Sequence, residues 1–308
     1  MTADLRSHAP MIEMIGPEPP EVAVGAEFVL KVKVSCAAGC ELDGMPLKLT
    51  AAADETVVAS EVGHETADIA LTAPRRTGEA SWTLVCGPHE SAGILHEETT
   101  VPVRIEVIPH ATSLAVWAVP SPVVMGENFA IKVGAKSSAG IALTGTTVEV
   151  CDEAGIVVAS GRLGETPLPG TSALYWSEIP LLAPVGEGVQ AWSVRFSAAD
   201  IELPHEQASS TFSIAIVRPP EHRLTIKVME KDTAAPIADA QLRLGAFRAA
   251  TDQAGLAEVD LPGGVYDLSI WKVGYEAPAR TVDLNGDASV EVEVVALPEE
   301  NPDTAWQM

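Results

Sequence analysis

Long apolar runs are missing from this chain of 308 residues. No stretch approaches the ~18 consecutive apolar residues that a membrane-spanning helix needs. The first ten residues include Asp4, Arg6 and His8, and they have no apolar core of the length found in secretion signals. We therefore expect a cytoplasmic protein without a membrane span. The alternative is an exported protein whose sequence is given in processed form.

Basic residues are scarce. Lys and Arg together number 19 against 43 Asp and Glu, which gives a formal net charge of −24. Nucleic-acid binding needs a basic surface that displaces phosphate counterions, so this composition argues against it. The same charge disfavours binding to an anionic membrane surface. Self-repulsion keeps such a chain soluble, and a charged partner would be a cationic protein or a divalent ion.

Helical periodicity is also absent, because no segment repeats apolar residues every 3.6 positions between capping residues. Apolar residues alternate with polar ones instead, as in Phe28–Val34, Val101–Val107 and Phe212–Ile216. This period of two is typical of antiparallel strands that bury one face. With 47% hydrophobic residues, 24 Gly and 23 Pro, the chain has enough apolar side chains for packed cores and dense turn signals. The sequence predicts an all-β protein built from sandwiches.

Cysteines number only four, at Cys36, Cys40, Cys86 and Cys151. Cys36 and Cys86 are far enough apart in the sequence to join the facing sheets of a sandwich through a disulfide. The second copy of the repeat has no cysteines at the matching positions, which argues against a required disulfide. Free buried thiols are the alternative. Cys36 and Cys40 form a C-x3-C pair, and one such pair without a second is a weak zinc signal.

Reaction motifs are lacking as well. The chain contains no H-E-x-x-H, no G-x-S-x-G and no glycine loop that could cradle a phosphate. His89, His96 and Glu97 are weak candidates for a divalent-metal site, because imidazole and carboxylate are common ligands. The alternative is that they are loop and strand-edge residues of an acidic protein. We expect no cofactor and no catalytic residue.

An internal repeat is the most informative feature that is present. Residues 20–32 return as residues 121–133, with Phe28 and Phe129 lying 101 positions apart. His96-Glu97 likewise returns as His205-Glu206, at a larger offset. The growing offset indicates an insertion in the second copy near residues 164–170, and surface loops tolerate such insertions. Each copy has the size of an immunoglobulin-like domain.

Proline-marked strand exits divide the chain further. We expect an N-terminal extension at 1–14, immunoglobulin-like sandwiches at 15–109 and 112–219, a third sandwich at 222–297, and an acidic tail at 298–308. Trp82 and Trp192 occupy matching positions in the two copies and are expected in the cores. The linkers are short, so the domains should form a fixed and elongated arrangement.

The third sandwich has its own turn chemistry. In Thr251-Asp252-x-x-Gly255, Asp caps a tight turn and Gly takes the positive φ. Together with Pro236, Ala240, Tyr266 and Gly274-Tyr275, this turn resembles the carboxypeptidase regulatory-like domain, over about residues 222–297. The resemblance implies a transthyretin-like, seven-stranded sandwich that serves as a non-catalytic folding or docking unit.

Two active groups of proteins similar to that fold do not match. Hydroxyisourate hydrolases need a histidine- and arginine-lined site and a Tyr-Arg-Gly-Ser terminus, whereas this chain ends in Thr-Ala-Trp-Gln-Met. Adhesin modules of the collagen-adhesin B type link a lysine to an asparagine with the help of a glutamate. Lys227 could serve as the lysine, but Ile270 stands where the glutamate is needed.

These observations predict a non-catalytic binding or scaffold subunit that docks to a larger protein assembly through sandwich edges and loops. One alternative is a carbohydrate-binding or adhesion-type surface module, and another is a metal-binding enzyme centred on His89 and His96. The candidate partner-binding residues are the basic doublet Arg75 and Arg76, the aromatic pair Tyr175 and Trp176 beside the insertion, and Trp306 in the tail. The sequence does not specify the partner or the oligomeric state.

Overall fold

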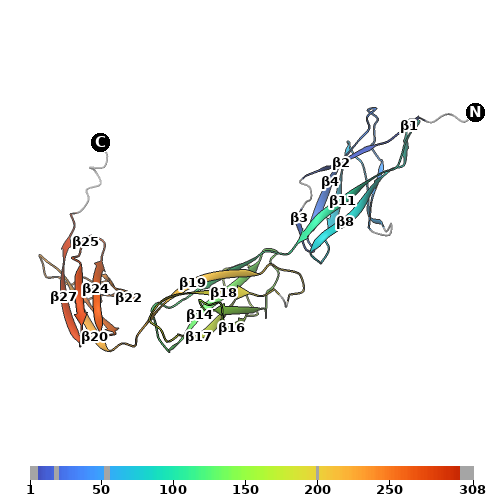
Figure 1. Ribbon diagram of the computed structural model, residues 1–308. Coiled ribbons are helices and arrows are strands. Elements are labelled where there is room, and N and C mark those ends of the chain that lie inside the picture. The colour runs from blue at the N-terminus through green and yellow to red at the C-terminus, as the bar shows by residue number, and fades with distance from the viewer. Residues whose placement is uncertain (1–5, 17–20, 52–55, 199–200, 299–308) are drawn as a thin grey trace, which may run out of the picture.

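The protein is an all-β chain, as the sequence predicts. The computed structural model describes residues 6–16, 21–51, 56–198 and 201–298. Three tandem β-sandwiches follow one another along a curved, elongated body, with the first and third sandwiches at its two ends (Figure 1). The described residues contain no helix that could cross a bilayer.

The first sandwich packs a three-stranded sheet of order β2-β4-β7 against a five-stranded sheet of order β3-β11-β8-β5-β6. A small third sheet of order β1-β10-β9 extends it at one end. The strands are β1 (Arg6–His8), β2 (Met11–Ile15), β3 (Glu21–Ala23), β4 (Glu27–Ser35), β5 (Pro46–Thr50), β6 (Thr56–Glu61), β7 (Thr66–Thr72), β8 (Gly78–Cys86), β9 (His89–Ser91), β10 (Ile94–His96) and β11 (Thr99–Ile108).

The first strands correct one expectation. Residues 6–14, which the sequence analysis assigned to an N-terminal extension, form β1 and most of β2. Ile12 and Met14 pack against the first core, and β2 pairs along its whole length with β4. Both strands are too short for alternation to stand out, and Met11 next to Ile12 obscures the period of two.

The second sandwich repeats the first. Its strands are β12 (Thr112–Trp117), β13 (Val123–Val124), β14 (Asn128–Ser137), β15 (Thr147–Cys151), β16 (Val157–Arg162), β17 (Tyr175–Leu182), β18 (Gly188–Phe196) and β19 (Ala208–Val217). The sheet orders β12-β14-β17 and β13-β19-β18-β15-β16 match those of the first sandwich strand for strand. The predicted insertion falls between β16 and β17, where residues 163–174 replace the short connection 62–65 between β6 and β7.

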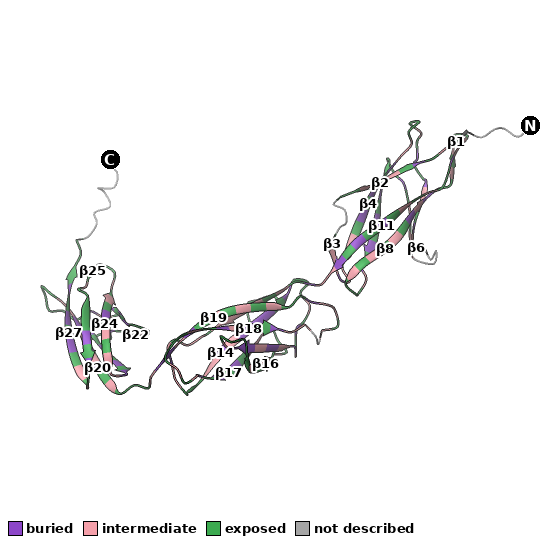
Figure 2. Ribbon diagram, viewed as in Figure 1, coloured by how far each residue is buried: buried purple, intermediate pink, exposed green. Residues whose placement is uncertain are grey.

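Separate hydrophobic cores fill the sandwiches. Buried residues alternate with exposed ones along the strands of each sandwich (Figure 2), as period-two patterning requires. Trp192 is 3% exposed and contacts Phe129 and Phe212, so the prediction of a core tryptophan is confirmed there. Its counterpart Trp82 is half-buried and packs against the first core.

The third sandwich has two four-stranded sheets, β23-β20-β27-β25 and β22-β21-β24-β26. Its strands are β20 (His222–Glu230), β21 (Gln241–Leu244), β22 (Phe247–Ala250), β23 (Leu256–Leu261), β24 (Gly264–Trp271), β25 (Tyr275–Glu276), β26 (Arg280–Leu284) and β27 (Ala288–Ala296). The turn predicted before β23 forms as expected. The Asp252 carboxylate accepts hydrogen bonds from the backbone N–H groups of Ala254 and Leu256, and Gly255 has a φ of +73°.

Short joints connect the sandwiches. Only residues 109–111 separate β11 from β12, and residues 218–221 separate β19 from β20. At the second joint, Arg218 forms an ion pair with Glu187 of the second sandwich and donates a hydrogen bond to the carbonyl of Gly263 in the third. These contacts favour the fixed arrangement that the linker lengths suggest.

Candidate metal centre and binding groove

Two histidines meet on the small sheet at the end of the first sandwich. The parallel pairing of β1 with β10 sets His8 directly beside His96. The backbone N–H of Glu97 donates to the carbonyl of His8 at 2.9 Å, and the Ser7 hydroxyl donates to the Glu97 carboxylate. The pairing therefore brings together two imidazoles that lie far apart in the sequence.

Two thiols face these histidines from the end of β4. Cys36 follows the last residue of that strand, and a turn closed by the Gly39 N–H on the Cys36 carbonyl brings Cys40 back beside it. Gly39 permits this turn because its φ is +70°. One ligand atom from each of His8, Cys36, Cys40 and His96 lies within 4.8 Å of all the others.

The contacts inside this group, which we call the His/Cys cluster, are close. The Nδ1 atom of His8 lies 3.2 Å from the Cys40 Sγ and 3.6 Å from the Cys36 Sγ. The His96 ring stands edge-on to the His8 ring, with centroids 6.0 Å apart. His96 is 0% exposed, and neither of its ring nitrogens has a hydrogen-bond partner among the described residues.

The two thiols are electrostatically unequal. Burial acts to raise the pKa of Cys36, but hydrogen bonds with the backbone of Ala38 and with Cys40 outweigh it, so this pKa is lowered. The hydrogen bond with Cys36 raises the pKa of Cys40. One proton shared between two sulfurs produces such opposite shifts.

The structure brings together only part of the predicted metal set. His96 belongs to the His/Cys cluster, whereas His89 and Glu97 are not among its four members. His89 pairs with His96 across β9 and β10, and Glu97 bonds to Ser7. The sequence analysis missed His8, because only the pairing of β1 with β10 places it near Cys36.

The cysteines do not form the disulfide considered between Cys36 and Cys86, since all four are free thiols. Cys86 is buried within the first core, with its Sγ 3.1 Å from the Met45 Sδ, and burial raises its pKa to about 11. Cys151 is likewise buried. Cys36 instead lies beside Cys40 and His8.

The second sandwich contains the corresponding position without thiols. His110 pairs in parallel with His205, and their ring centroids are 5.2 Å apart. The Glu206 N–H donates to the His110 carbonyl, as the Glu97 N–H does to His8. Ser137 occupies the place of Cys36, because the Gly140 N–H closes the same turn on its carbonyl, and Ile141 replaces Cys40. The Ser137 hydroxyl and the Nε2 of His205 are 2.9 Å apart.

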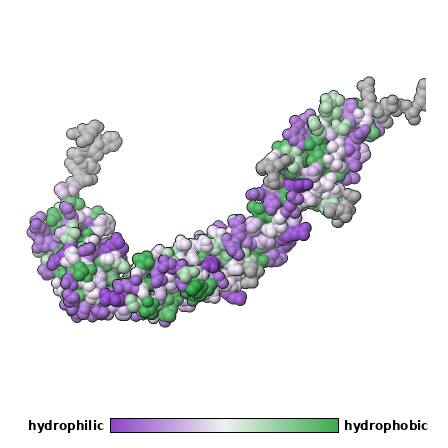
Figure 3. Space-filling model, in the orientation of Figure 1, coloured by the Kyte–Doolittle hydropathy of each residue, from purple (hydrophilic) through white to green (hydrophobic). Residues whose placement is uncertain are grey.

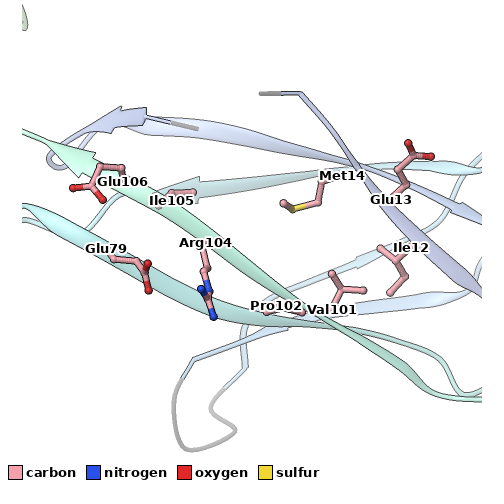
Figure 4. Close-up of a pocket in the computed structure, with 9 residues that line it drawn as sticks. All are labelled: Ile12, Glu13, Met14, Glu79, Val101, Pro102, Arg104, Ile105 and Glu106. Carbon is pink, nitrogen blue, oxygen red and sulfur yellow. The ribbon is translucent and has the colours of Figure 1, made fainter. Parts of the chain in front are cut away.

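A groove lies elsewhere on the first sandwich, between β2 and β11. It has a volume of about 650 Å³ and is open to solvent. Figure 4 shows Ile12 and Met14 on the β2 side opposite Val101, Pro102 and Ile105 on β11. The charged lining residues are Glu13, Glu79, Arg104 and Glu106. The sequence analysis missed this groove, which depends on how far the two sheets separate.

The predicted partner-binding residues have varied surroundings. Arg75 forms an ion pair with Glu202 in the loop between β18 and β19, so it connects the first two sandwiches, while Arg76 is exposed. Tyr175 packs against the second core. Trp176 lies beside Trp117, and the Lys132 ammonium sits 5.3 Å from the centre of its ring. Trp306 lies outside the described residues.

Comparisons with known proteins give no family. No family description and no curated protein matches the chain. Among solved structures, a mutant of Salmonella alpha-2-macroglobulin is 11% identical with a TM-score of 0.26, and the match covers 92% of this chain but 23% of that one. The chain thus spans under a quarter of that protein.

Two further structures are similar at the same level. The ICAM-5 ectodomain fragment is 14% identical with a TM-score of 0.32, covering 89% of this chain and 75% of that one. BcpA, the major pilin subunit of Bacillus cereus, is 7% identical with a TM-score of 0.22, covering 93% and 99%. These values are too low to carry an argument about function.

Proposed function

We propose that this chain is a non-catalytic binding or scaffold protein that docks to a protein assembly through open sandwich edges. The groove between β2 and β11 carries this proposal, because it combines an apolar floor with exposed strand edges. The three sandwiches in a row provide several such edges along one elongated body (Figure 1). The lack of reaction motifs in the sequence also supports a non-catalytic role.

Among the described residues, backbone groups on both sides of the groove are open to a partner. The edge strand β2 pairs with β4 alone among the described strands. On the groove side, the described part of the chain pairs β11 with β3 only from Glu106 to Ile108. An extended segment can therefore add to either edge by main-chain hydrogen bonds, as in other strand-addition complexes.

The lining indicates the chemistry of the partner segment. Ile12, Met14 and Val101 are partly exposed and offer apolar contacts to alternate side chains of an added strand. The rim has three glutamates, Glu13, Glu79 and Glu106, against the single Arg104. The surface otherwise mixes hydrophilic and apolar side chains (Figure 3), and the chain carries a net charge of −24. We infer that the partner segment is extended and alternates apolar with basic residues.

Fluorescence anisotropy with labelled peptides tests this proposal on the full chain. A peptide of alternating valine and lysine should bind, and one of alternating valine and glutamate should not. Reversing two rim charges with Glu79→Lys and Glu106→Lys should weaken binding about tenfold, which corresponds to about 1.4 kcal/mol.

The control variant combines Glu153→Lys and Glu165→Lys, which change the net charge equally but lie in exposed loops of the second sandwich. It should bind the lysine peptide nearly as well as the unmodified chain. Equal weakening by both variants would assign binding to total charge rather than to the groove. Failure of the lysine peptide to bind would refute strand addition at this site.

The third sandwich extends the proposal. We infer that it is a carboxypeptidase regulatory-like module with a docking role, supported by the Asp252 turn and by the Tyr266 hydroxyl, which donates to the carbonyl of Pro262 at 2.8 Å.

A cytoplasmic location remains part of the proposal. The carbohydrate-binding alternative is less favoured, because Lys132 lies over the Trp176 ring on which a sugar would stack.

A further inference from the structure

We infer that His8, Cys36, Cys40 and His96 bind one zinc ion, which fastens the N-terminal strand β1 to the first sandwich. This site is separate from the groove and does not depend on it. Its four ligands come from three segments, namely β1, the turn after β4, and β10. A single ion therefore joins parts of the chain that are otherwise linked by short strand pairings.

The ligand types and their spacing suit zinc. Zinc binds two thiolates and two imidazoles in a tetrahedron, with bonds of about 2.3 Å to sulfur and 2.0–2.1 Å to nitrogen. Such bonds imply separations of about 3.3–3.8 Å between ligand atoms. The distances from the His8 Nδ1 to the two sulfurs, 3.2 and 3.6 Å, lie near this range, and all four atoms lie within 4.8 Å.

His96 provides independent support. Its side chain is fully buried, yet neither ring nitrogen meets a hydrogen-bond partner among the described residues. Leaving buried polar atoms unsatisfied is unfavourable, and coordination of a metal by one nitrogen removes part of that cost. One of its ring nitrogens lies within 4.8 Å of a ligand atom of each of the other three members, so a metal ion could meet it there.

The second sandwich shows how the protein itself can satisfy the ring nitrogens of a histidine at the matching position. There the Nδ1 of His205 lies 2.8 Å from the Leu203 carbonyl, and its Nε2 lies 2.9 Å from the Ser137 hydroxyl. Both ring nitrogens are thus satisfied by the protein. The first sandwich has Cys36 in place of that serine, and in the described part of the chain His96 has no such partners.

Charge balance also favours a dication. Binding requires the Cys36 and Cys40 thiols to release their protons to solvent, and the two resulting thiolates neutralise Zn²⁺. A neutral centre is compatible with a partly buried site, whereas an isolated charge is not. Four protein ligands leave no open position, which is typical of a structural rather than a catalytic zinc.

Metal analysis of the purified full chain tests the site. After dialysis against a weak chelator, elemental analysis should give one zinc per chain. Cobalt substitution should produce sulfur-to-cobalt charge-transfer absorption and the intense visible bands of tetrahedral coordination. The double variant Cys36→Ser with Cys40→Ser should lose both signals and bind zinc more than about 100-fold more weakly, since loss of an outer-shell partner alone costs about 10–100-fold.

The matched control is Cys151→Ala, which removes a buried thiol of the second sandwich and should leave one zinc bound. To separate metal loss from misfolding, zinc can be stripped from the unmodified chain with a strong chelator and then restored. Hydrogen exchange of the backbone amides in residues 6–8 and 94–97 should accelerate at least about tenfold on stripping and recover on zinc addition.

Zinc content that persists in the double variant would overturn the assignment, as would a chain that binds no zinc or cobalt. A disulfide between Cys36 and Cys40 in freshly purified protein that remains metal-free after reduction would also refute it. Peptide binding at the groove is measured separately, so either proposal can fail without the other.

Discussion

Single turn residues decide whether the strands of the third sandwich can meet. Thr251 is buried, and its hydroxyl donates to the Ile237 carbonyl at 2.6 Å while accepting from the Ala240 N–H at 2.9 Å. The next residue, Asp252, caps the turn that leads into β23. These neighbours hold the chain so close to β20 that Gly255 has no room for a side chain.

We predict that Gly255→Ala destabilises the third sandwich strongly. An added Cβ would lie 2.6 Å from the Val228 carbonyl oxygen and 3.1 Å from the Ile237 nitrogen, both backbone atoms. The left-handed backbone contributes about 1–2 kcal/mol of destabilisation, and the overpacking contributes a further ~1–3 kcal/mol. Native-state hydrogen exchange of β20 and β23 amides measures the loss.

Gly245→Ala is the control, because Gly245 has a φ of +60° but nothing within 4 Å of the added Cβ. It should show the backbone contribution alone. If both variants lowered protection equally, the close approach at Gly255 would have no energetic role.

At the scale of elements, the alternation of apolar and polar residues and the internal sequence repeat were enough to predict most of the fold. The two copies share one sheet order, and the insertion after β16 lies where the offset changes. The His/Cys cluster could not be predicted in this way. Its ligands are spread from His8 to His96, and only Cys36 and Cys40 have a spacing that hints at a metal site. They meet through β1 and β10, which are three residues long and show no period.

The duplicated elements offer a test of what the cluster requires. The second sandwich retains the paired imidazoles of His110 and His205, but it has Ser137 and Ile141 where the first has thiols. We predict that Ser137→Cys combined with Ile141→Cys raises the zinc content from one to two ions per chain. The Nε2 of His205 already lies 2.9 Å from the Ser137 hydroxyl. Its Nδ1 lies 2.8 Å from the Leu203 carbonyl, and a carbonyl at this place is typical of imidazoles that bind zinc through the other nitrogen.

Elemental analysis and the charge-transfer absorption of the cobalt form give the stoichiometry, and Ser137→Ala combined with Ile141→Ala is the control. A count that stays at one would mean that strand pairing alone does not position the imidazoles for a metal, and that the small sheet β1-β10-β9 is needed.

At the scale of the whole molecule, the joint between the first two sandwiches depends on the loop after β18. Leu203 from this loop packs against Val24 and its neighbours in the first sandwich, and Glu202 forms an ion pair with Arg75. The His110 N–H donates to the Pro204 carbonyl at 3.0 Å, which ties the linker to the same loop. His110 and His205 are both buried at this joint.

The buried histidine pair makes this joint sensitive to acid. Burial lowers the pKa of His110, the neighbouring His205 lowers it further, and a hydrogen bond with the backbone of Val24 opposes both effects. The closed joint therefore binds fewer protons than an open one between the lowered pKa and the ordinary value of about 6.5. Its stability is complete above that value and decreases as the pH falls below it.

We predict that hydrogen exchange in residues 201–206 accelerates between pH 7.5 and 5.5, after correction for the intrinsic rate, by at most about tenfold per pH unit for one proton. His110→Gln cannot gain a proton, so its corrected exchange should be independent of pH over this range. His64→Gln, whose histidine side chain is 99% exposed, should behave like the unmodified chain. Titration of His110 predicts that the pH response disappears in His110→Gln. A variant that kept the full pH response would assign the effect to another group.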